Sequence, residues 1–187
     1  LPEYYYILKP NGSPELKYVG VSPTGELPES INFPLYPHKE SSSFKVLLFG
    51  DTQTSNQTEI DYLAHDIVEE LTGTDAIFGI TLGDIMNNNL SFFDSLNSTI
   101  GLIGIPWYNV MGNHDRNYDG KLPEYSDETF ERIYGPSYYS FDYGDAHLIV
   151  LYDVMHNPVD GGYKGGLGSD QMSFVKNDLN LVPKDKL

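Results

Sequence analysis

Six polar side chains of metal-binding or catalytic type follow three apolar stretches of the chain. Each stretch ends in a glycine, after which come these residues: Asp51 and Gln53, then Asp84, then Asn113, His114 and Asp115. Carboxylate oxygen, amide oxygen and imidazole nitrogen are ligands that Mn, Fe, Zn or Mg take in proteins. Two such ions activate a hydroxide and clamp the oxygens of a phosphoryl group during in-line displacement. The three endings together therefore predict a dinuclear metal site.

The spacing of these endings predicts how they meet. Asp51, Asp84 and Asn113 follow one another at intervals of about 30 residues, the length of a strand, a helix and the return to a parallel strand. Parallel strands bring their carboxyl ends to one edge of the sheet, which is where open α/β sheets bind ligands. We therefore expect the six side chains to converge at one edge of an α/β fold.

Residues 56–71 predict the first of the connecting helices. Asn56 is the expected N-cap, and Glu59 three residues later completes a capping box. Six apolar residues recur at helical spacing and form the expected core face: Ile60, Leu63, Ala64, Ile67, Val68 and Leu71. The preceding run, 44–50, is continuously apolar, as is typical of a strand covered on both faces of its sheet.

The rest of the chain gives shorter predictions. Residues 138–153 alternate about Gly144 and Asp145 and predict a β-hairpin. The last amphipathic stretch predicts a helix that is capped by Ser169 and stopped by Pro183. The first 20 residues predict a short strand or a hairpin with its turn at 10–12, and the Pro-rich stretch after them predicts an extended linker.

Composition and charge exclude several classes of protein. The 187 residues are 40% hydrophobic, enough for a globular core, and no stretch approaches the roughly 18 uninterrupted apolar residues of a membrane span. The formal net charge of −16 disfavours nucleic-acid binding by a basic face. The absence of cysteine excludes disulfides, thiolate metal sites and cysteine nucleophiles.

Three ordered blocks carry a family resemblance. GDTQ at 50–53, GDIMNN at 83–88 and GNHD at 112–115 resemble the first signature blocks of the calcineurin-like metallophosphoesterases. The head and tail of the chain resemble bacterial members with accessory domains on both sides of the core, which are commonly exported. The resemblance implies the N-terminal half of an αββα sandwich, a mixed sheet with flanking helices plus an extended N-terminal segment. It divides the chain into the tail of a small β accessory domain with its linker, 1–43, and an incomplete phosphoesterase domain, 44–187.

The resemblance also implies a role for each residue of the blocks. Asp51 and Gln53 would serve the first metal, Asp84 would bridge both metals, and Asn113 would serve the second. His114 would be the catalytic imidazole, which stabilises or protonates the leaving oxygen. The resemblance makes the neighbouring Asp115 its orienting partner.

Two departures from the family pattern bear on activity. The family usually has histidine where this chain has Gln53, which either ligates metal weakly through its carbonyl oxygen or only hydrogen-bonds a neighbour. The family's middle histidine and its final Gly-His-x-His block do not occur in this sequence. The resemblance therefore implies a chain that stops before the last ligand blocks, with low or no activity and metal sites that are weakly filled.

Three further polar residues are weaker candidates. Asn88 follows Asp84 and either binds substrate or belongs to the cap of the next helix. His156 lies in a loop beside proline, where it either touches substrate or is solvated. His147 falls within the predicted hairpin, and a structural histidine is the expected reading there.

Two functional hypotheses remain. The first is a metal-dependent phosphoesterase that hydrolyses small phosphate mono- or diesters through a metal-bound hydroxide. The second is a decayed phosphoesterase fold that serves as a binding or structural module of an exported multidomain protein. In either case exposed sheet favours pairing with another copy of the chain, so a homodimer is expected.

Overall fold

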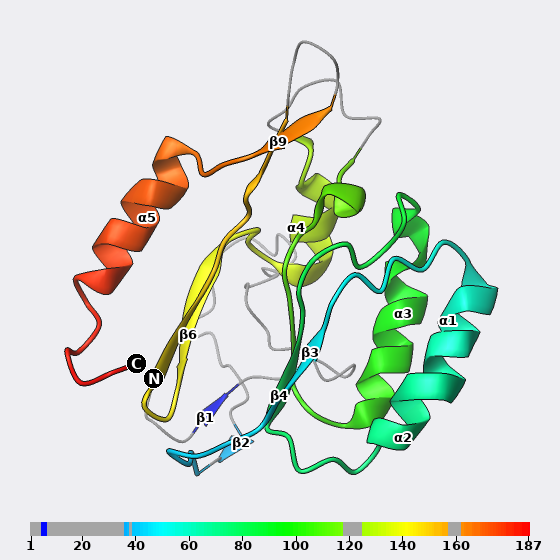
Figure 1. Cartoon of the computed structure of the whole chain (residues 1–187), viewed down its shortest axis with the longest axis horizontal. Helices are drawn as coiled ribbons and strands as arrows, with labels where there is room; N and C mark the ends of the chain where they lie inside the picture. The colour runs from blue at the N-terminus through cyan, green and yellow to red at the C-terminus, as the bar shows by residue number, and fades with distance from the viewer. Residues whose placement is uncertain (1–4, 7–35, 38, 118–124, 157–161) are drawn as a thin grey trace, which may run out of the picture.

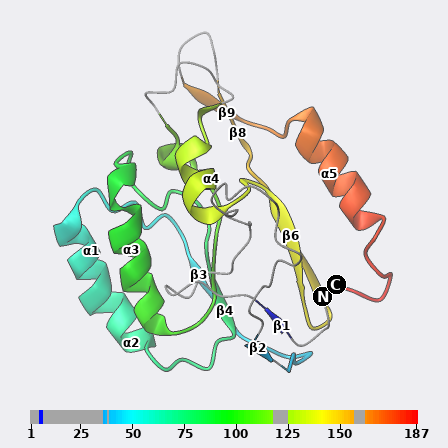
Figure 2. The same cartoon turned by 180° about the vertical axis from the view of Figure 1, so that it is seen from behind.

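The computed structural model describes residues 5–6, 36–37, 39–117, 125–156 and 162–187. Helices α1 to α3 cover one face of a parallel sheet, the β6–β7 hairpin packs on its other face, and α5 lies outside the hairpin (Figure 1). The view from behind shows the same four layers (Figure 2). The predicted fold class, a mixed α/β sandwich with flanking helices, is therefore confirmed.

The parallel sheet has the strand order β3-β4-β5. Its strands are β3 (Val46–Phe49), β4 (Phe78–Thr81) and β5 (Trp107–Asn109). Phe49 pairs with Thr81 and Thr81 with Asn109, so the three strands end level with one another. This common register brings the segments that follow all three strands to one edge of the sheet, as the 30-residue spacing predicts.

Two helical segments connect these strands. The first comprises α1 (Gln57–Leu63), a π-helical turn η1 (Ala64–Val68) and α2 (Glu69–Leu71). The second comprises the 3-10 turn η2 (Leu90–Phe92), α3 (Phe93–Ile100) and the 3-10 turn η3 (Gly101–Ile103). Both pack on the same face of the sheet, where Ile60, Phe93, Leu96 and Trp107 are almost completely buried in the larger core.

The first helix begins as its capping residues predict. The Asn56 side chain accepts the backbone N–H of Glu59, which confirms Asn56 as N-cap. The Glu59 carboxylate, however, accepts the backbone N–H of Ser55 at 2.7 Å rather than that of Asn56. Ile67, expected in the core, is 43% exposed, because the π turn adds a residue per turn and rotates it away from the sheet.

The remaining elements complete the two outer layers. The antiparallel hairpin pairs β6 (Tyr139–Tyr143) with β7 (Ala146–Val150), and α5 spans Ser169–Leu179. Beyond the ends of the parallel strands lie α4 (Glu128–Tyr134) and the short pair β8 (Val154–His156) and β9 (Tyr163–Gly165). The sequence did not predict α4, β8 or β9.

An aromatic cluster joins the two sheets. The ring of Phe78 on the central strand β4 contacts Tyr108, Phe141 and Tyr143 edge-on, with ring centroids 5.5 to 5.7 Å apart. Tyr108 and Phe141 stack in parallel at 3.8 Å. Such pairs add about 0.5–1.5 kcal/mol each beyond the apolar area that they bury. The cluster thus fixes the position of the hairpin over the parallel sheet.

Two expectations from the sequence, on β3 and on α5, are wrong, whereas the short strand expected in the first 20 residues is present as β1. Leu48 is 60% exposed, because β3 is an edge strand of the described sheet and is not covered on both faces there. β1 (Tyr5–Tyr6) pairs with β2 (Tyr36–Pro37), so the first strand takes its partner from the predicted linker; the expected turn at 10–12 lies outside the described residues. Gly168, not Ser169, is the N-cap of α5.

None of the helices in the described part of the chain has the length and apolar composition that crossing a bilayer requires.

Substitution of Gly79 tests how closely the central strand β4 packs against Trp107. A Cβ at this position would overlap the ring of Trp107, so we expect Gly79→Ala to lower the free energy of unfolding by about 1–3 kcal/mol. Gly50→Ala is the matched control, because no atom lies within 4 Å of its added Cβ, and it should change stability by less than about 0.5 kcal/mol. Urea unfolding measures both, and equal midpoints for the two variants would contradict this packing.

Candidate functional site

The predicted residues gather where the parallel strands end, at the upper edge of the sheet in Figure 1. Glycines permit the segments after β4 and β5 to approach. A Cβ on Gly112 would overlap the backbone nitrogen and side chain of Asp84, and a Cβ on Gly83 would lie 3.2 Å from the Gly112 Cα. Gly83 also has a φ of +99°, which L side chains rarely adopt. These two glycines therefore set how closely Asp84 lies to the GNHD segment.

Unusual backbone conformation is concentrated in this region. Four non-glycine residues of the described chain have positive φ, namely Asp51 (41°), Gln53 (41°), Asp84 (46°) and Asn88 (66°). All four belong to the candidate site. Left-handed conformations of non-glycine residues are uncommon and cluster at active sites and ligand clamps. The backbone thus supports the candidate site independently of the side-chain types.

Asp84 lies at the centre of the arrangement and is 9% exposed. Its Oδ1 accepts the backbone N–H of His114 at 3.0 Å, and its Oδ2 accepts the side-chain amide of Gln53 at 2.9 Å. The Gln53 backbone N–H also donates to the Asp84 carbonyl. Of the two readings left open for Gln53, the structure shows the hydrogen bond to a neighbour; ligation of a metal through its carbonyl oxygen stays a prediction.

The imidazole of His114 is held by Asn88. The His114 Nδ1 lies 2.9 Å from the Asn88 Oδ1, and the Asn88 backbone N–H donates to the His114 carbonyl at 3.2 Å. Because Oδ1 of an amide only accepts hydrogen bonds, Nδ1 carries the proton and Nε2 points away from this contact. Of the two readings of Asn88, the helix cap is wrong, because Asn89 is the N-cap of the next helical turn, while substrate binding stays a prediction. The structure shows Asn88 as the hydrogen-bond partner that orients the His114 ring.

The expected pairing of Asp115 with His114 is wrong. Asp115 is fully buried, and its carboxylate accepts three backbone N–H groups, those of Ile85 (3.1 Å), Met86 (2.9 Å) and Gly112 (2.9 Å). The first two follow β4 and the third follows β5. Asp115 therefore ties the two strand ends together, while the imidazole that adjacency in the sequence suggested as its partner contacts Asn88 instead.

The environment of Asp115 also shifts its ionisation. Burial raises the pKa of Asp115 to about 6, because desolvation outweighs the three backbone N–H donors that favour the charged form. The nearby carboxylate of Asp84 adds to the increase. Two carboxyl groups of one edge thus interact electrostatically, although only Asp84 is among the predicted ligands.

Arg116 is a residue of this region that sequence reasoning missed. Its side chain is 3% exposed, its Nε donates to the Asn113 carbonyl at 3.3 Å, and its guanidinium lies 5.6 Å from the ring centroid of Tyr163 on β9. A buried arginine can be stacked on an aromatic ring in this way. The only sequence signal is its position directly after GNHD. Arg116 links the β8–β9 pair to the rim of the site.

The donors available to a metal are carboxylate and amide oxygens. Asp51 is exposed at the end of the first block, Asp84 is central, and Asn113 occupies the segment after β5. Within the described part, no three histidine, cysteine, aspartate or glutamate side chains are grouped as a metal site. The donor types suit a hard or borderline divalent ion, but the described residues do not group three such acidic or histidine side chains around one point.

Two other candidate histidines lie elsewhere. His156 is the last residue of β8, and its side chain falls outside the described part of the structure. His147 lies on β7 in a polar network of its own, so its expected structural role agrees with its position.

The fold is therefore a layered α/β sandwich whose parallel strands end at an edge that carries Asp84 and a histidine held by Asn88. The family model of the calcineurin-like phosphoesterases matches residues 44–182. The chain belongs to this family, which typically depends on two metal ions. The resemblance recognised in the three sequence blocks is thus confirmed.

A solved structure supports the fold. Purple acid phosphatase PPD1, isolated from yellow lupin (Lupinus luteus) seeds, is similar with a TM-score of 0.52 and 20% sequence identity. The similarity covers 79% of this chain and 29% of that chain. The chain therefore spans under a third of the length of this relative. No curated protein matches the chain in sequence.

Asp115→Asn tests how the site is held together. An amide supplies one acceptor oxygen and turns an NH₂ group toward backbone donors, so at least one buried N–H loses its partner. We expect a loss of about 1–3 kcal/mol in the free energy of unfolding, measured by urea denaturation. Asp75→Asn is the matched control, since this carboxylate is 73% exposed and paired with Lys45. A stability loss no larger than that of the control would contradict the assigned role.

Proposed function

We propose that this edge is part of a phosphoesterase site in which His114 exchanges a proton with the leaving oxygen of a phosphate ester. The observation that carries the proposal is the His114–Asn88 hydrogen bond beside Asp84. It fixes the ring from one side, so that Nε2 is the nitrogen available to a bound substrate. A positioned imidazole of this kind contributes about 10²–10⁴-fold to proton-transfer catalysis.

Divalent metal ions are part of this proposal because the calcineurin-like phosphoesterases typically depend on two of them. Asp51, Asp84 and Asn113 would hold them with oxygen ligands, and the Gln53 carbonyl oxygen is the remaining candidate. Bound Mn, Fe, Zn or Mg would supply Lewis-acid stabilisation of phosphoryl charge. Two ions per site, as in the family, require ligands beyond those grouped in the described residues. The complete dinuclear site is therefore proposed for a longer protein, and this chain alone is proposed to have low activity.

The arrangement of this chain's own residues gives each a task in that reaction. Asp84 holds the His114 backbone through Oδ1, which places the imidazole relative to the proposed metal ligands. Asn88 sets the ring orientation and the tautomer. Asp115 holds the two strand ends, so that Asn88 and His114 stay within hydrogen-bond distance.

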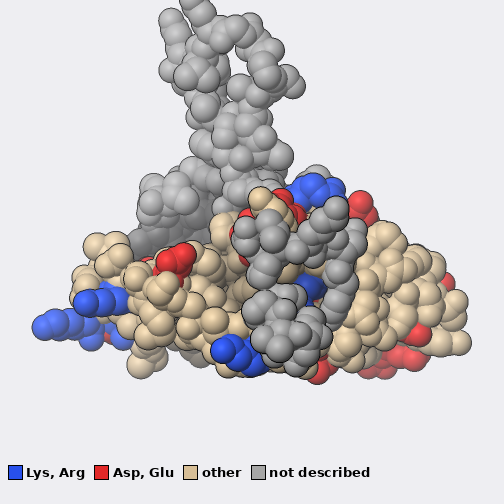
Figure 3. All heavy atoms as spheres, turned by 90° about the horizontal axis from the view of Figure 1, so that it is seen from above, with Lys and Arg blue, Asp and Glu red and all other residues tan. Residues whose placement is uncertain are grey.

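The proposed substrate is a small phosphate mono- or diester. The net charge of −16 opposes long-range attraction of nucleic acid, and on the face seen in Figure 3 lysine and arginine side chains are scattered among acidic ones. With few basic side chains, neutralisation of the substrate's charge falls to the proposed metals. We propose no nucleic-acid binding by a basic face.

A decayed fold that acts as a binding or structural module is the second candidate. One observation favours it: both oxygens of Asp84 accept hydrogen bonds within the protein, one of them from the Gln53 amide that replaces the usual histidine. A carboxylate engaged in this way is less available as a metal bridge. Measured metal binding separates the two candidates, because the module does not need it.

Three further statements remain proposals. We propose the division into an accessory segment, 1–43, and the phosphoesterase part, 44–187, and export from the cytoplasm. We also propose homodimerisation through the exposed sheet, because the edge strand β3 presents Leu48 to solvent at 60% exposure.

Metal titration tests the proposed function directly. We expect Mn²⁺ added to this chain to bind weakly by calorimetry, and Asp84→Asn to weaken the binding at least tenfold, because a carboxylate is replaced by a neutral amide. Asp75→Asn should bind as the unmodified chain does, because Asp75 is exposed and precedes β4, at the opposite end of the strand from Asp84. Absence of any binding, or binding that survives Asp84→Asn, would favour the structural module.

Hydrolysis of an aryl phosphate with excess Mn²⁺ gives the second readout. In the longer protein, we expect His114→Ala and Asn88→Ala to lower kcat about 10²-fold or more, with the smaller loss for Asn88→Ala, whose imidazole remains. Activity that survives both substitutions would contradict the assigned roles.

A further inference from the structure

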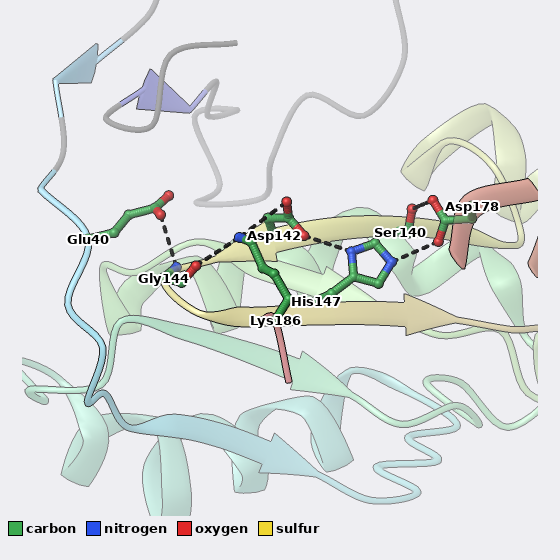
Figure 4. A network of polar contacts seen from close by, with 7 residues as sticks. All are labelled: Glu40, Ser140, Asp142, Gly144, His147, Asp178 and Lys186. Carbon is green, nitrogen blue, oxygen red and sulfur yellow. Dashed lines mark hydrogen bonds and ion pairs between the residues drawn. The ribbon is translucent and has the colours of Figure 1, made fainter. Parts of the chain in front are cut away.

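A polar network fastens the C-terminal segment to the outer face of the β6–β7 hairpin (Figure 4). His147 on β7 stands at its centre, with a side chain that is only 10% exposed. Its Nδ1 lies 2.7 Å from the carboxylate of Asp142 on β6, and its Nε2 lies 2.8 Å from that of Asp178 on α5. Both ring nitrogens therefore face carboxylates that come from different elements.

This geometry selects one ionisation state of the ring. Ionised carboxylates only accept hydrogen bonds, so each contact needs an N–H on the imidazole. A neutral ring has a single N–H, and its second nitrogen would turn a lone pair toward a carboxylate oxygen. Both contacts are satisfied together only by the imidazolium cation.

Other charged groups around His147 belong to the same network. Lys186 lies 3.3 Å from Asp142 and donates to the Gly144 carbonyl at 2.8 Å, while Ser140 donates to Asp178. Glu40 accepts the Gly144 backbone N–H at the end of the network. Two carboxylates, one from β6 and one from α5, thus face the ring, and one lysine faces one of them. With Lys186 offsetting one of the two carboxylates, the protonated His147 ring offsets the other.

The network is one of three attachments of α5 and the residues after it. At its start, the Gln171 amide exchanges two hydrogen bonds with the Tyr152 backbone, at 2.6 and 2.8 Å. In its middle, Phe174 contacts the ring of Tyr138 at 5.3 Å. These two are insensitive to pH between 5 and 9, since neither contains a group that titrates there. Of these three attachments, only the network at the end of α5 contains a histidine side chain.

The residues after α5 are attached to the same part of the hairpin. The His147 backbone N–H donates to the Leu187 carbonyl at 2.9 Å, and the Leu187 N–H donates to the Asp145 carbonyl at 2.8 Å. Leu187 thereby joins the open edge of β7. The apolar side chains nearby give little support, because Leu179 is 53% and Leu181 83% exposed. Polar contacts therefore hold this segment, namely the two backbone hydrogen bonds of Leu187 and the side-chain contacts of His147 and Lys186.

We propose that His147 is a pH-dependent latch that keeps residues 178–187 on the hairpin while its ring is protonated and releases them when the proton is lost. Residues 178–187 are called the latched segment below. The start of α5 stays attached through Gln171 and Phe174 in both states. Release would uncover the outer edge of β7 and the polar face of the hairpin.

The ionisation of the network supports this direction. Burial lowers the pKa of His147, but the hydrogen bonds to Asp142 and Asp178 outweigh it and raise the pKa above the ordinary 6.5. A raised histidine pKa means that the stabilisation is fully present below the unfolded-state pKa and is lost as pH rises through the folded-state pKa. The pKa of Asp142 is lowered, despite burial, by His147 and Lys186, so its share is lost only in acid.

Two measurements on the unmodified chain test the latch. In a proton NMR titration, the His147 ring should titrate above 6.5, the ordinary pKa of a histidine side chain. Hydrogen exchange, corrected for its intrinsic dependence on pH, should show protection of the Leu187 and His147 amides that falls several-fold between about pH 6 and about pH 9. Amides of β4 should keep their protection over this range. Titration of His147 at or below the ordinary histidine pKa of 6.5, or constant protection of the latched segment, would overturn the proposal.

Two variants at the latch predict opposite results. His147→Gln has one donor group and one acceptor, as the neutral ring has, so the latched segment should exchange fast at every pH. Asp178→Asn offers an NH₂ to the ring, so a neutral imidazole satisfies both neighbours and protection should stay high at every pH. If both variants keep the pH dependence of the unmodified chain, another group carries it and the latch is wrong. Neither variant lies among the proposed phosphoesterase residues, so the result is independent of that function.

Discussion

The buried carboxylate of Asp115 is the interaction on which the candidate site depends. Its two oxygens accept hydrogen bonds from backbone N–H groups of the segment after β4 and of the segment after β5. Asn88 lies two residues beyond Met86, the second of the two donors after β4, and His114 immediately precedes Asp115. The hydrogen bond between Asn88 and His114 can form only when these two segments are in register, and a carboxylate is the side chain that accepts several N–H groups at once.

The backbone conformations at this edge are unfavourable in free energy, and interactions within and around the sheet offset that cost. Asp51, Gln53, Asp84 and Asn88 all have positive φ, each at about 1–3 kcal/mol. Such conformations persist because their surroundings allow no alternative. Here the level ends of three parallel strands, the close approach of Gly83 to Gly112, and the three hydrogen bonds of Asp115 supply that constraint. The aromatic cluster around Phe78 holds the sheet from the other face.

The sequence predicts the placement of the site well because that placement follows from spacing. Strand endings about 30 residues apart lie at one edge of a parallel sheet, and the segments with Asp51, Asp84 and His114 all follow strands that end at this edge. The partners within the site follow from backbone geometry instead. Nothing in the GNHD block distinguishes an Asp115 that orients the neighbouring imidazole from one that accepts N–H groups 30 residues away. In the same way, the π turn that exposes Ile67 has no signal in a regular apolar pattern.

His114 and His147 are both held by hydrogen bonds, but their partners differ in charge. His114 faces an amide, which carries no net charge, so the contact fixes the ring and its tautomer while leaving Nε2 and the ring's charge to whatever binds at the site. His147 faces a carboxylate on each side, so its two contacts require the cation and cannot be satisfied by the neutral ring. A residue that exchanges protons during a reaction must be stable in both states, and an amide partner permits this. A residue that fastens two segments benefits from the opposite, because a partner pair that tolerates one state only makes attachment follow the proton.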